Sequence, residues 1–214
     1  MKPVLIFDLD GTLIDSRQDL ANSVNATRTF MGLAPISNEL VYSYVGEGAP
    51  VLIRRAMGSE APQEDVDRAL EFFLQYYRQH QLDHTTLYPG VREALEALKA
   101  DGAHLNVLTN KPIRMSREIL AGLGINSHFE YVYGGNSFEF KKPHPIGIHT
   151  IVRDTNAVRE KTIMVGDSGV DIQTARNAGV LSCGVSYGFQ PDTLVTYPPD
   201  FMIDNMGDLI GKIL

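Results

Sequence analysis

The chain has 214 residues, of which 43 % are hydrophobic and 21 % are charged, and this composition excludes a wholly disordered protein. Its formal net charge is −7 and no basic run stands out, so nucleic acid and anionic membranes are not expected as partners. A single cysteine excludes an internal disulfide framework or a cysteine-rich zinc site. No apolar stretch resembles a signal sequence or a membrane span, so we expect a soluble, cytoplasmic protein.

Short apolar runs alternate with helical patterns along much of the chain. Strands are expected at residues 4–7, 105–108, 129–133, 162–165, 180–185 and 201–203. Helices are expected at residues 91–100, 112–123, 145–152 and 172–178. Because strands and helices alternate from about residue 86 onward, the sequence predicts an α/β fold with a doubly wound parallel sheet.

The segment of residues 16–83 has a different pattern. It is nearly all helical in its periodicity, with Val66, Phe73 and Tyr77 on one helix face, and it contains no clear alternating strand. We therefore expect a core domain of residues 1–15 and 84–214, interrupted by a helical domain of residues 16–83.

Polar side chains follow three of the predicted strands. Asp8 and Asp10 follow the first strand, Thr109 and Asn110 follow the second, and Asp167 follows the strand that ends at residue 165. In an open parallel sheet, ligands bind at the carboxyl ends of the strands. A polar residue after one strand is most simply explained as the cap of the next helix. Polar residues directly after three strands favour a shared site instead.

The spacing of the aspartates indicates a cation. Asp8 and Asp10 are two residues apart, so on an extended strand both would project the same way, and their repulsion calls for a cation or a shared proton. Asp171 is four residues beyond Asp167, in the first turn of the next helix and on the side that faces Asp167. Mg²⁺ is the expected ion, because it binds through a few carboxylates together with water and substrate phosphate.

Charge balance indicates that a lysine belongs to the same site. One Mg²⁺ and one lysine leave the four aspartates with one uncompensated negative charge, unless one of them holds a proton. Lys142 is the best candidate, because Pro143 and Pro145 would stiffen its loop, whereas Lys141 is expected to lie in solvent.

These residues resemble a known family. Four segments are similar, in order and spacing, to the four motifs of the haloacid dehalogenase superfamily: Asp8-Leu9-Asp10-Gly11-Thr12, Leu108-Thr109-Asn110, Lys142-Pro143 and Gly166-Asp167-Ser168-Gly169-Val170-Asp171. The resemblance covers the whole chain. It implies a Rossmann-like core, and the insertion is similar to the small α-helical cap of that family. Residues 44–50 and the phrase Thr109-Asn110-Lys111-Pro112 most resemble its phosphoglycolate phosphatase branch.

The resemblance implies catalytic roles for four residues. Asp8 matches the nucleophile that forms an aspartyl phosphate. Asp10 matches the general acid that protonates the leaving alkoxide and then serves as the base for water. Thr109 would donate a hydrogen bond to the phosphoryl oxygens, and Lys142 would steady the nucleophile and the phosphate.

The resemblance also implies a metal site and contacts to the substrate. Mg²⁺ would be bound by Asp8, Asp167 and the backbone carbonyl of Asp10, with Asp171 supporting it directly or through water. Asn110 is expected to contact the leaving group or a loop.

The helical domain is expected to close over the site and exclude water. Gly46 and Gly48 could bring a cap loop close to the substrate, although an ordinary turn between helices explains them equally well. Arg54 or Arg55 could clamp a substrate carboxylate, but a solvated helix face is the more ordinary interpretation.

The expected function is Mg²⁺-dependent hydrolysis of a small phosphorylated metabolite, with 2-phosphoglycolate as the first candidate. Asp10 disfavours dehalogenase activity, because the dehalogenases of the superfamily lack this second aspartate. A pyrophosphatase, a sugar phosphate phosphatase and a mutase similar to β-phosphoglucomutase remain alternatives within the fold. A phospho-accepting signalling module is the alternative from another class, although receiver domains have no helical cap.

One further motif resembles the nucleophile motif of serine hydrolases, but the rest of the sequence does not support that chemistry. Residues 184–188 match the G-x-S-x-G pattern of serine hydrolases, which requires a histidine later in the chain. All six histidines precede Ser186, so a catalytic triad is excluded.

Overall fold

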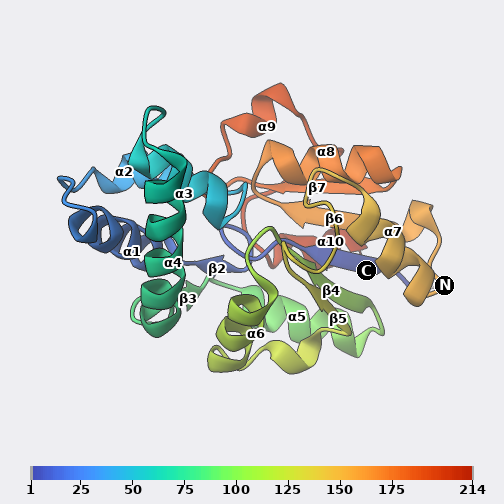
Figure 1. Cartoon of the computed structure of the whole chain (residues 1–214). Coiled ribbons are helices and arrows are strands. Elements are labelled where there is room, and N and C mark those ends of the chain that lie inside the picture. Colours follow the sequence, from blue (N-terminus) through green and yellow to red (C-terminus); the bar gives the residue numbers. More distant parts are fainter. Residues whose placement is uncertain (1, 214) are drawn as a thin grey trace. The chain divides into compact units, whose positions relative to one another are not determined.

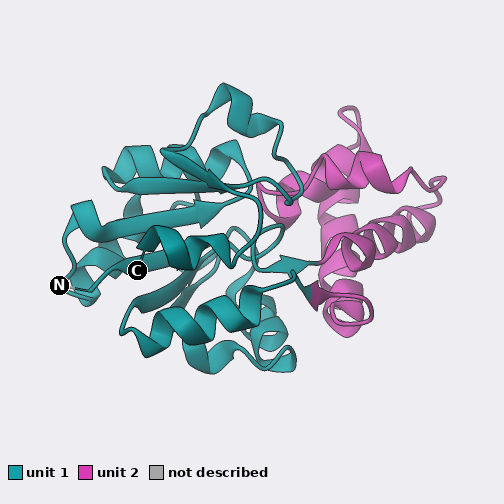
Figure 2. Ribbon diagram, turned by 180° about the vertical axis from the view of Figure 1, so that it is seen from behind, with its two compact units in different colours: residues 1–15, 87–214 teal, residues 16–86 magenta. Residues whose placement is uncertain are grey.

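The computed structural model describes residues 2–213, and the chain divides into two compact units (Figure 2). One unit comprises residues 1–15 and 87–214, and the other is Ser16–Thr86. The predicted domain boundary after residue 83 lies slightly before the end of the second unit. Residues 84 and 85 belong to the second unit because hydrogen bonds tie them to Asp19 in its first helix.

Within residues 2–213 the first unit contains a six-stranded sheet with the order β5-β4-β1-β6-β7-β8, and each adjacent pair is parallel (Figure 1). The strands are β1 (Val4–Phe7), β4 (His104–Leu108), β5 (Tyr131–Tyr133), β6 (Thr162–Gly166), β7 (Leu181–Val185) and β8 (Phe201–Ile203). This confirms the predicted α/β fold with a doubly wound parallel sheet.

Two details of the strands differ from the prediction. The strand expected at residues 129–133 begins only at Tyr131, two residues after a 3-10 turn at Asn126–His128. The short strands β2 (Ile14–Asp15) and β3 (Thr86–Leu87) form a separate two-stranded sheet that the hydrophobic pattern did not predict. Strands of two residues are too short to show a period.

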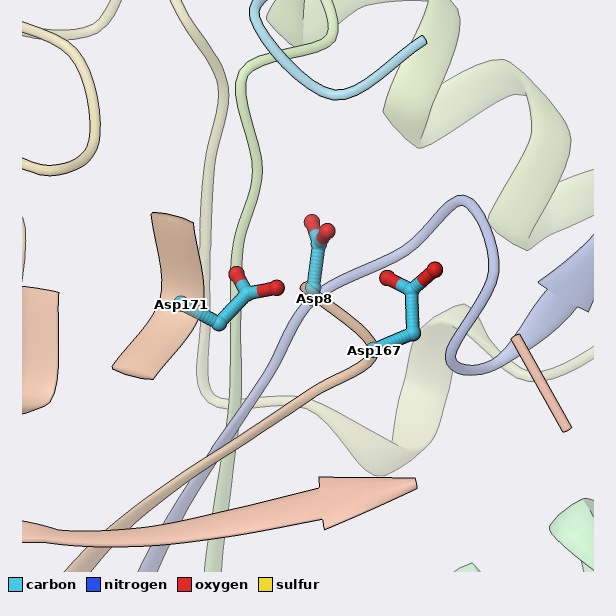
Figure 3. A group of neighbouring side chains, drawn as sticks. All are labelled: Asp8, Asp167 and Asp171. Atoms are coloured by element: carbon cyan, nitrogen blue, oxygen red, sulfur yellow. The ribbon is translucent and has the colours of Figure 1, made fainter. Parts of the chain in front are cut away.

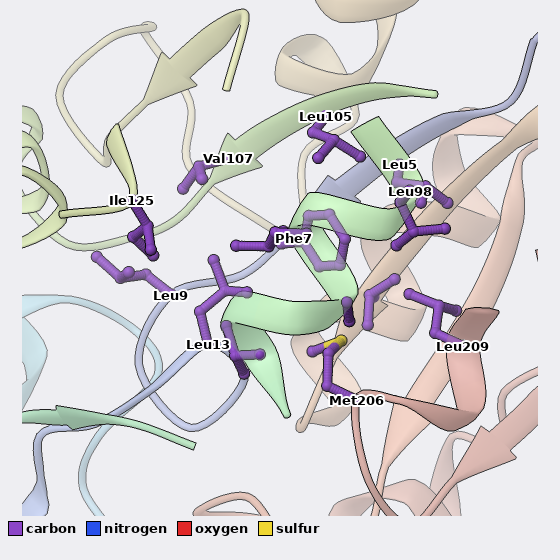
Figure 4. Packing of buried hydrophobic residues seen from close by; sticks show 14 of the residues in the cluster. Leu5, Phe7, Leu9, Leu13, Leu98, Leu105, Val107, Ile125, Met206 and Leu209 are labelled. Carbon is purple, nitrogen blue, oxygen red and sulfur yellow. The ribbon is translucent and has the colours of Figure 1, made fainter. Parts of the chain in front are cut away.

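Helices cover both faces of the six-stranded sheet. Successive side chains of β1 point to opposite faces, so both faces carry apolar side chains that pack against helices. Leu5 and Phe7 belong to the core cluster that includes Leu98 and Leu209 (Figure 4). That cluster packs α5 (Val91–Ala100), α6 (Ile113–Gly122) and α10 (Asp208–Ile213) against one face. On the other face, Ile6 packs in a second cluster with α7 (Ile146–Asp154) and α8 (Gly169–Ala178). A central strand that is buried on both faces is typical of parallel sheets.

The second unit is helical, in agreement with the pattern of its sequence. Its helices are α1 (Arg17–Phe30), α2 (Asn38–Tyr42), α3 (Ala49–Met57) and α4 (Gln63–His80). The predicted face of α4 is buried at Val66, Phe73 and Tyr77, and α4 packs on α1 and α3. Among residues 2–213, no helix is both long and apolar enough to cross a membrane.

A buried carboxylate joins the two ends of this unit. Asp19 of α1 is 1 % exposed and accepts hydrogen bonds from the backbone N–H of His84 at 3.0 Å and of Thr85 at 2.8 Å. The Thr85 hydroxyl donates to the same carboxylate at 2.7 Å, and His84 Nδ1 lies 2.8 Å from it. A carboxylate that is satisfied in this way holds the segment that leads back to the core.

Replacing Asp19 by alanine should lower the free energy of unfolding by ~3 kcal/mol, because it removes the acceptor of the His84 N–H and leaves the buried N–H and O–H donors of Thr85 without a partner. Urea unfolding monitored by circular dichroism measures this change. The control is Glu71→Ala, at an exposed position on α4, which should change stability by less than ~0.5 kcal/mol. Equal stability of the two variants would contradict a structural role for Asp19.

Candidate active site

Three strands of the parallel sheet deliver polar residues to the same edge. Asp8, Thr109 and Asp167 are the first residues beyond β1, β4 and β6, and β1 pairs in register with both of the other strands. The Asp8 N–H donates to the carbonyl of Val165 at 2.9 Å, and the Thr109 N–H donates to the carbonyl of Tyr133 at 3.0 Å. These ladder bonds fix the backbone one residue beyond the strands, where the functional side chains begin.

Three buried carboxylates converge at this edge (Figure 3). One carboxylate oxygen from each of Asp8, Asp167 and Asp171 lies within 4.8 Å of the others, and among residues 2–213 this is the group arranged to hold a metal ion. Asp171 comes from the first turn of α8, whose N-terminus favours negative charge. The structure therefore brings together three of the four aspartates that the sequence analysis selected.

The surroundings of the cluster favour bound protons when no cation is present. Burial raises the pKa of Asp167 to about 8, and the negative charges of Asp171 and Asp8 act in the same direction. Burial also raises the pKa of Asp8, to about 6, against the opposing charge of Lys142. The negative charges of Asp8, Asp167 and Asp171 therefore repel one another, and this repulsion calls for a cation or a proton.

Lys142 lies between two of these carboxylates. Its Nζ is 2.6 Å from Oδ1 of Asp171 and 2.9 Å from Oδ1 of Asp8, and its side chain is only 2 % exposed. Burial alone would lower the pKa of Lys142, but the charges of Asp171 and Asp8 outweigh it and raise the pKa. The lysine consequently remains an ammonium ion within the site.

Asn110 holds the backbone of Lys142. The Lys142 N–H donates to Asn110 Oδ1 at 3.0 Å, and Asn110 Nδ2 donates to the Lys142 carbonyl at 3.1 Å. The sequence analysis expected Asn110 to contact the leaving group or a loop. In the structure both ends of its amide position the loop that carries the lysine, and a contact with the leaving group remains a prediction.

Asp10 lies apart from the group of three carboxylates. The argument from an extended strand does not apply to it, because β1 ends at Phe7 and the chain then turns, with the Leu13 N–H bonded to the Leu9 carbonyl at 3.0 Å. The two carboxylate oxygens of Asp10 are 2.9 and 3.0 Å from Nζ of Lys111. The expected role of Asp10 in metal binding involves its backbone carbonyl and remains a prediction.

Lys111 is a buried residue of this site whose position the sequence analysis missed. Its side chain is 5 % exposed, which is unusual for lysine, and its partner is the aspartate expected to act as general acid. The available signal was its place directly after Thr109-Asn110, at the same strand end. The Lys111 N–H donates to Oγ1 of Thr109 at 3.2 Å, so the two side chains are parts of one turn.

Three glycines allow the backbone to approach the aspartates closely. A Cβ atom at Gly11 would lie 2.3 Å from Oδ2 of Asp167, and a Cβ at Gly166 would lie 2.2 Å from Cγ of Asp171. A Cβ at Gly188 would lie 2.1 Å from Cβ of Asp167. No other residue type fits at these positions without moving a carboxylate.

The loop after β7 contributes through its backbone. The N–H groups of Phe189 and Gln190 donate to Oδ2 of Asp167 at 2.6 and 3.3 Å. The sequence analysis noted Gly188 only as part of the excluded serine hydrolase pattern. Because these donors are main-chain groups, the side chains of the loop gave no signal of this contact.

Replacing Gly188 by alanine should reduce the phosphate ester hydrolysis expected from the sequence at least ~100-fold, because the new methyl group displaces the Asp167 carboxylate from the cluster. Hydrolysis of a phosphate ester with saturating Mg²⁺ provides the measurement. Gly211→Ala is the matched control, since a Cβ there has nothing within 4 Å and alanine favours the helix. Full activity of the Gly188 variant would contradict the tight packing around Asp167.

The sequence analysis named Gly46, Arg54 and Arg55 of the helical unit as possible substrate contacts, and the structure gives their conformation and contacts within that unit. Gly46 has a φ of 118°, a conformation that favours glycine. Arg55 forms an ion pair with Glu47, and Arg54 donates a hydrogen bond to the carbonyl of Ala61 at 2.7 Å. Both guanidinium groups thus have partners within the helical unit, and the described contacts do not favour either arginine as a substrate clamp.

The fold and site can now be compared with those of known proteins. The sequence model of haloacid dehalogenase-like hydrolases matches residues 5–185, a range that contains the aspartates of the site together with Thr109, Asn110, Lys111 and Lys142. The chain belongs to this family. Its parallel sheet and the helical insertion after β1 agree with a crystal structure of a predicted phosphoglycolate phosphatase from Haemophilus somnus. The two chains are 33 % identical, with a TM-score of 0.95 over 100 % of this chain and 98 % of the other.

Two relatives align with this chain over nearly the whole length of both sequences. A phosphoglycolate phosphatase from Colwellia psychrerythraea is 40 % identical, covering 98 % of this chain and 96 % of the relative. A phosphoglycolate phosphatase from Agrobacterium fabrum is 38 % identical, covering 98 % of this chain and 91 % of the relative.

Proposed function

We propose that the protein is a Mg²⁺-dependent phosphatase that hydrolyses 2-phosphoglycolate to glycolate and phosphate through an aspartyl phosphate. The observation that carries this proposal is the buried group of Asp8, Asp167 and Asp171, together with Lys142, which contacts both Asp8 and Asp171. The choice of substrate is supported by full-length relatives that are named phosphoglycolate phosphatase.

The residues of the cluster fit a hard divalent cation. All of the donors are carboxylate oxygens, as Mg²⁺ prefers, and one oxygen from each of the buried Asp8, Asp167 and Asp171 lies within 4.8 Å of the others. Asp8, Asp167 and the Asp10 carbonyl would hold the ion, with Asp171 supporting it. The bound ion would supply positive charge that lets a phosphate dianion enter an acidic pocket.

The protein's own residues perform the two chemical steps. A carboxylate oxygen of Asp8 bonds to phosphorus while the ester P–O bond breaks, and the departing alkoxide takes a proton from Asp10. Asp10 then accepts a proton from the water that attacks phosphorus, the Asp8–phosphorus bond breaks, and phosphate leaves. Lys142 and Thr109 hold the phosphoryl oxygens during both steps.

A panel of phosphate esters tests this function. The purified protein is assayed for free phosphate from 2-phosphoglycolate, glucose 6-phosphate, β-glucose 1-phosphate and pyrophosphate, with Mg²⁺ or with EDTA. We expect kcat/KM for 2-phosphoglycolate to exceed the others at least ~10-fold and all activity to disappear with EDTA. A flat profile would remove the substrate assignment. A phosphorylated isomer without free phosphate would indicate a mutase, and a stable phosphoprotein without turnover would indicate a signalling module.

A further inference from the structure

We propose that Lys111 binds the carboxylate of the substrate and thereby sets the specificity of the site for acidic phosphate esters. This inference rests on the proposed function, since it concerns the leaving group of that reaction. The observation behind it is the buried ion pair in which Nζ of Lys111 contacts both oxygens of Asp10.

The position of the Lys111 backbone is tightly fixed. Its N–H is bonded to Oγ1 of Thr109 at 3.2 Å, and its carbonyl accepts a hydrogen bond from the N–H of Gly135 at 2.8 Å. A Cβ at Gly134 would lie 2.7 Å from the same carbonyl, so this neighbouring loop is packed closely against it. An ammonium ion held on such a turn is ordered before a ligand arrives, which favours binding.

The geometry of the substrate places its carboxylate near this ammonium. In the proposed reaction Asp10 protonates the ester oxygen, so its carboxyl group must lie within hydrogen-bond distance of that oxygen. In 2-phosphoglycolate a single methylene joins the ester oxygen to the carboxylate carbon, and the carboxylate oxygens lie about 3 Å from the ester oxygen by ordinary bond lengths. A cation in contact with Asp10 is therefore within reach of the substrate carboxylate.

The charges of the site also favour this role. When Asp10 holds the proton that the first step requires, one divalent cation and Lys142 balance the other three aspartates, and Lys111 supplies one further positive charge. An acidic ester brings one more negative charge than a neutral ester, so it benefits most from a second ammonium. Lys142 shows that one ammonium in this site can serve two carboxylates, since it contacts both Asp8 and Asp171.

A purely structural role for Lys111 makes a different prediction. If the lysine only positions Asp10, its loss would slow every substrate by the same factor, because each requires the same general acid. If it binds the substrate carboxylate, part of the loss is confined to substrates that carry this group. The ratio of two substrates therefore separates the roles even if the variant also has a general defect.

The experiment compares 2-phosphoglycolate with 2-hydroxyethyl phosphate, in which a hydroxymethyl group replaces the carboxylate. Values of kcat/KM are measured with saturating Mg²⁺ for wild type, Lys111→Gln, Lys111→Arg and the exposed control Lys212→Gln. We expect Lys111→Gln to reduce the preference for 2-phosphoglycolate by 10- to 100-fold, the usual range for a charge-assisted hydrogen bond. Lys111→Arg should keep most of the preference, and Lys212→Gln should keep all of it.

An unchanged preference in Lys111→Gln, with equal losses for both esters, would overturn the role of Lys111 and leave the proposed function intact. Wild-type protein that hydrolyses both esters equally well would instead overturn the proposed substrate and, with it, the need for a carboxylate site. Thermal unfolding of each variant verifies that it is folded before the ratios are compared.

Discussion

Replacement of Asp8 by asparagine is expected to reduce turnover of 2-phosphoglycolate by a factor on the order of 10⁴ or more. The amide cannot form the aspartyl phosphate, and the remaining groups only bind and orient the substrate. The variant should remain folded, because loss of one charge relieves repulsion with Asp167 and Asp171 although Lys142 loses one of its two partners. Steady-state phosphate release and urea unfolding measure both properties.

Asp192→Asn is the matched control for this variant. It makes the same change of a carboxylate to an amide at an exposed position on the first unit, at the start of α9 (Thr193–Thr196), and should keep wild-type activity. If Asp8→Asn retained a tenth of the wild-type rate while remaining folded, covalent catalysis by Asp8 would be excluded.

Binding of Mg²⁺ should release about one proton at pH 7, because the metal requires ionised carboxylates. In the protein without a cation the pKa of Asp167 is raised to about 8 and that of Asp8 to about 6, so at pH 7 the former still holds most of a proton. Calorimetric titrations at pH 7 in PIPES and in Tris, whose ionisation enthalpies differ, count the protons released. Equal apparent enthalpies in the two buffers would contradict the expected release.

The same pKa shifts determine how stability depends on pH. Both carboxyl groups titrate near 3.8 in an unfolded chain, so between about pH 4 and pH 8 the folded protein without metal binds more protons than the unfolded one. Its free energy of unfolding should therefore decrease as pH rises through this range. Stabilisation by Mg²⁺ should increase over the same range, which unfolding midpoints with and without Mg²⁺ at pH 5.5 and pH 8 would show. A smaller effect of Mg²⁺ at pH 8 would contradict the raised pKa values.

The arrangement of the site could be predicted where it follows from the periodicity of the strands. Apolar runs locate β1, β4 and β6, and a parallel sheet brings their ends to one edge, so the approach of Asp8 to Asp167 follows from the pattern. The burial of Lys111 does not follow from it. Lysine side chains usually lie in solvent, and the pairing of Lys111 with Asp10 depends on how the turn after β1 folds.

Other features could not be predicted because they depend on the backbone. The N–H groups of Phe189 and Gln190 that hold Asp167 exist in every sequence, so only the path of the loop makes them functional. The pairing of Asn110 with the backbone of Lys142 is of the same kind, since it joins residues 32 positions apart through main-chain groups. Tertiary structure, and not residue type, decided these contacts.

Calorimetric titration of inorganic phosphate into the protein tests most directly whether a divalent cation admits a dianion to the acidic pocket. The titration is made at pH 7.5 with saturating Mg²⁺, with EDTA, and with Mg²⁺ on Asp167→Asn. We predict measurable binding with Mg²⁺ and an affinity at least ~100-fold weaker with EDTA and in the variant, because buried carboxylates without the ion repel phosphate. Equal affinity with and without Mg²⁺ would contradict this account of the site.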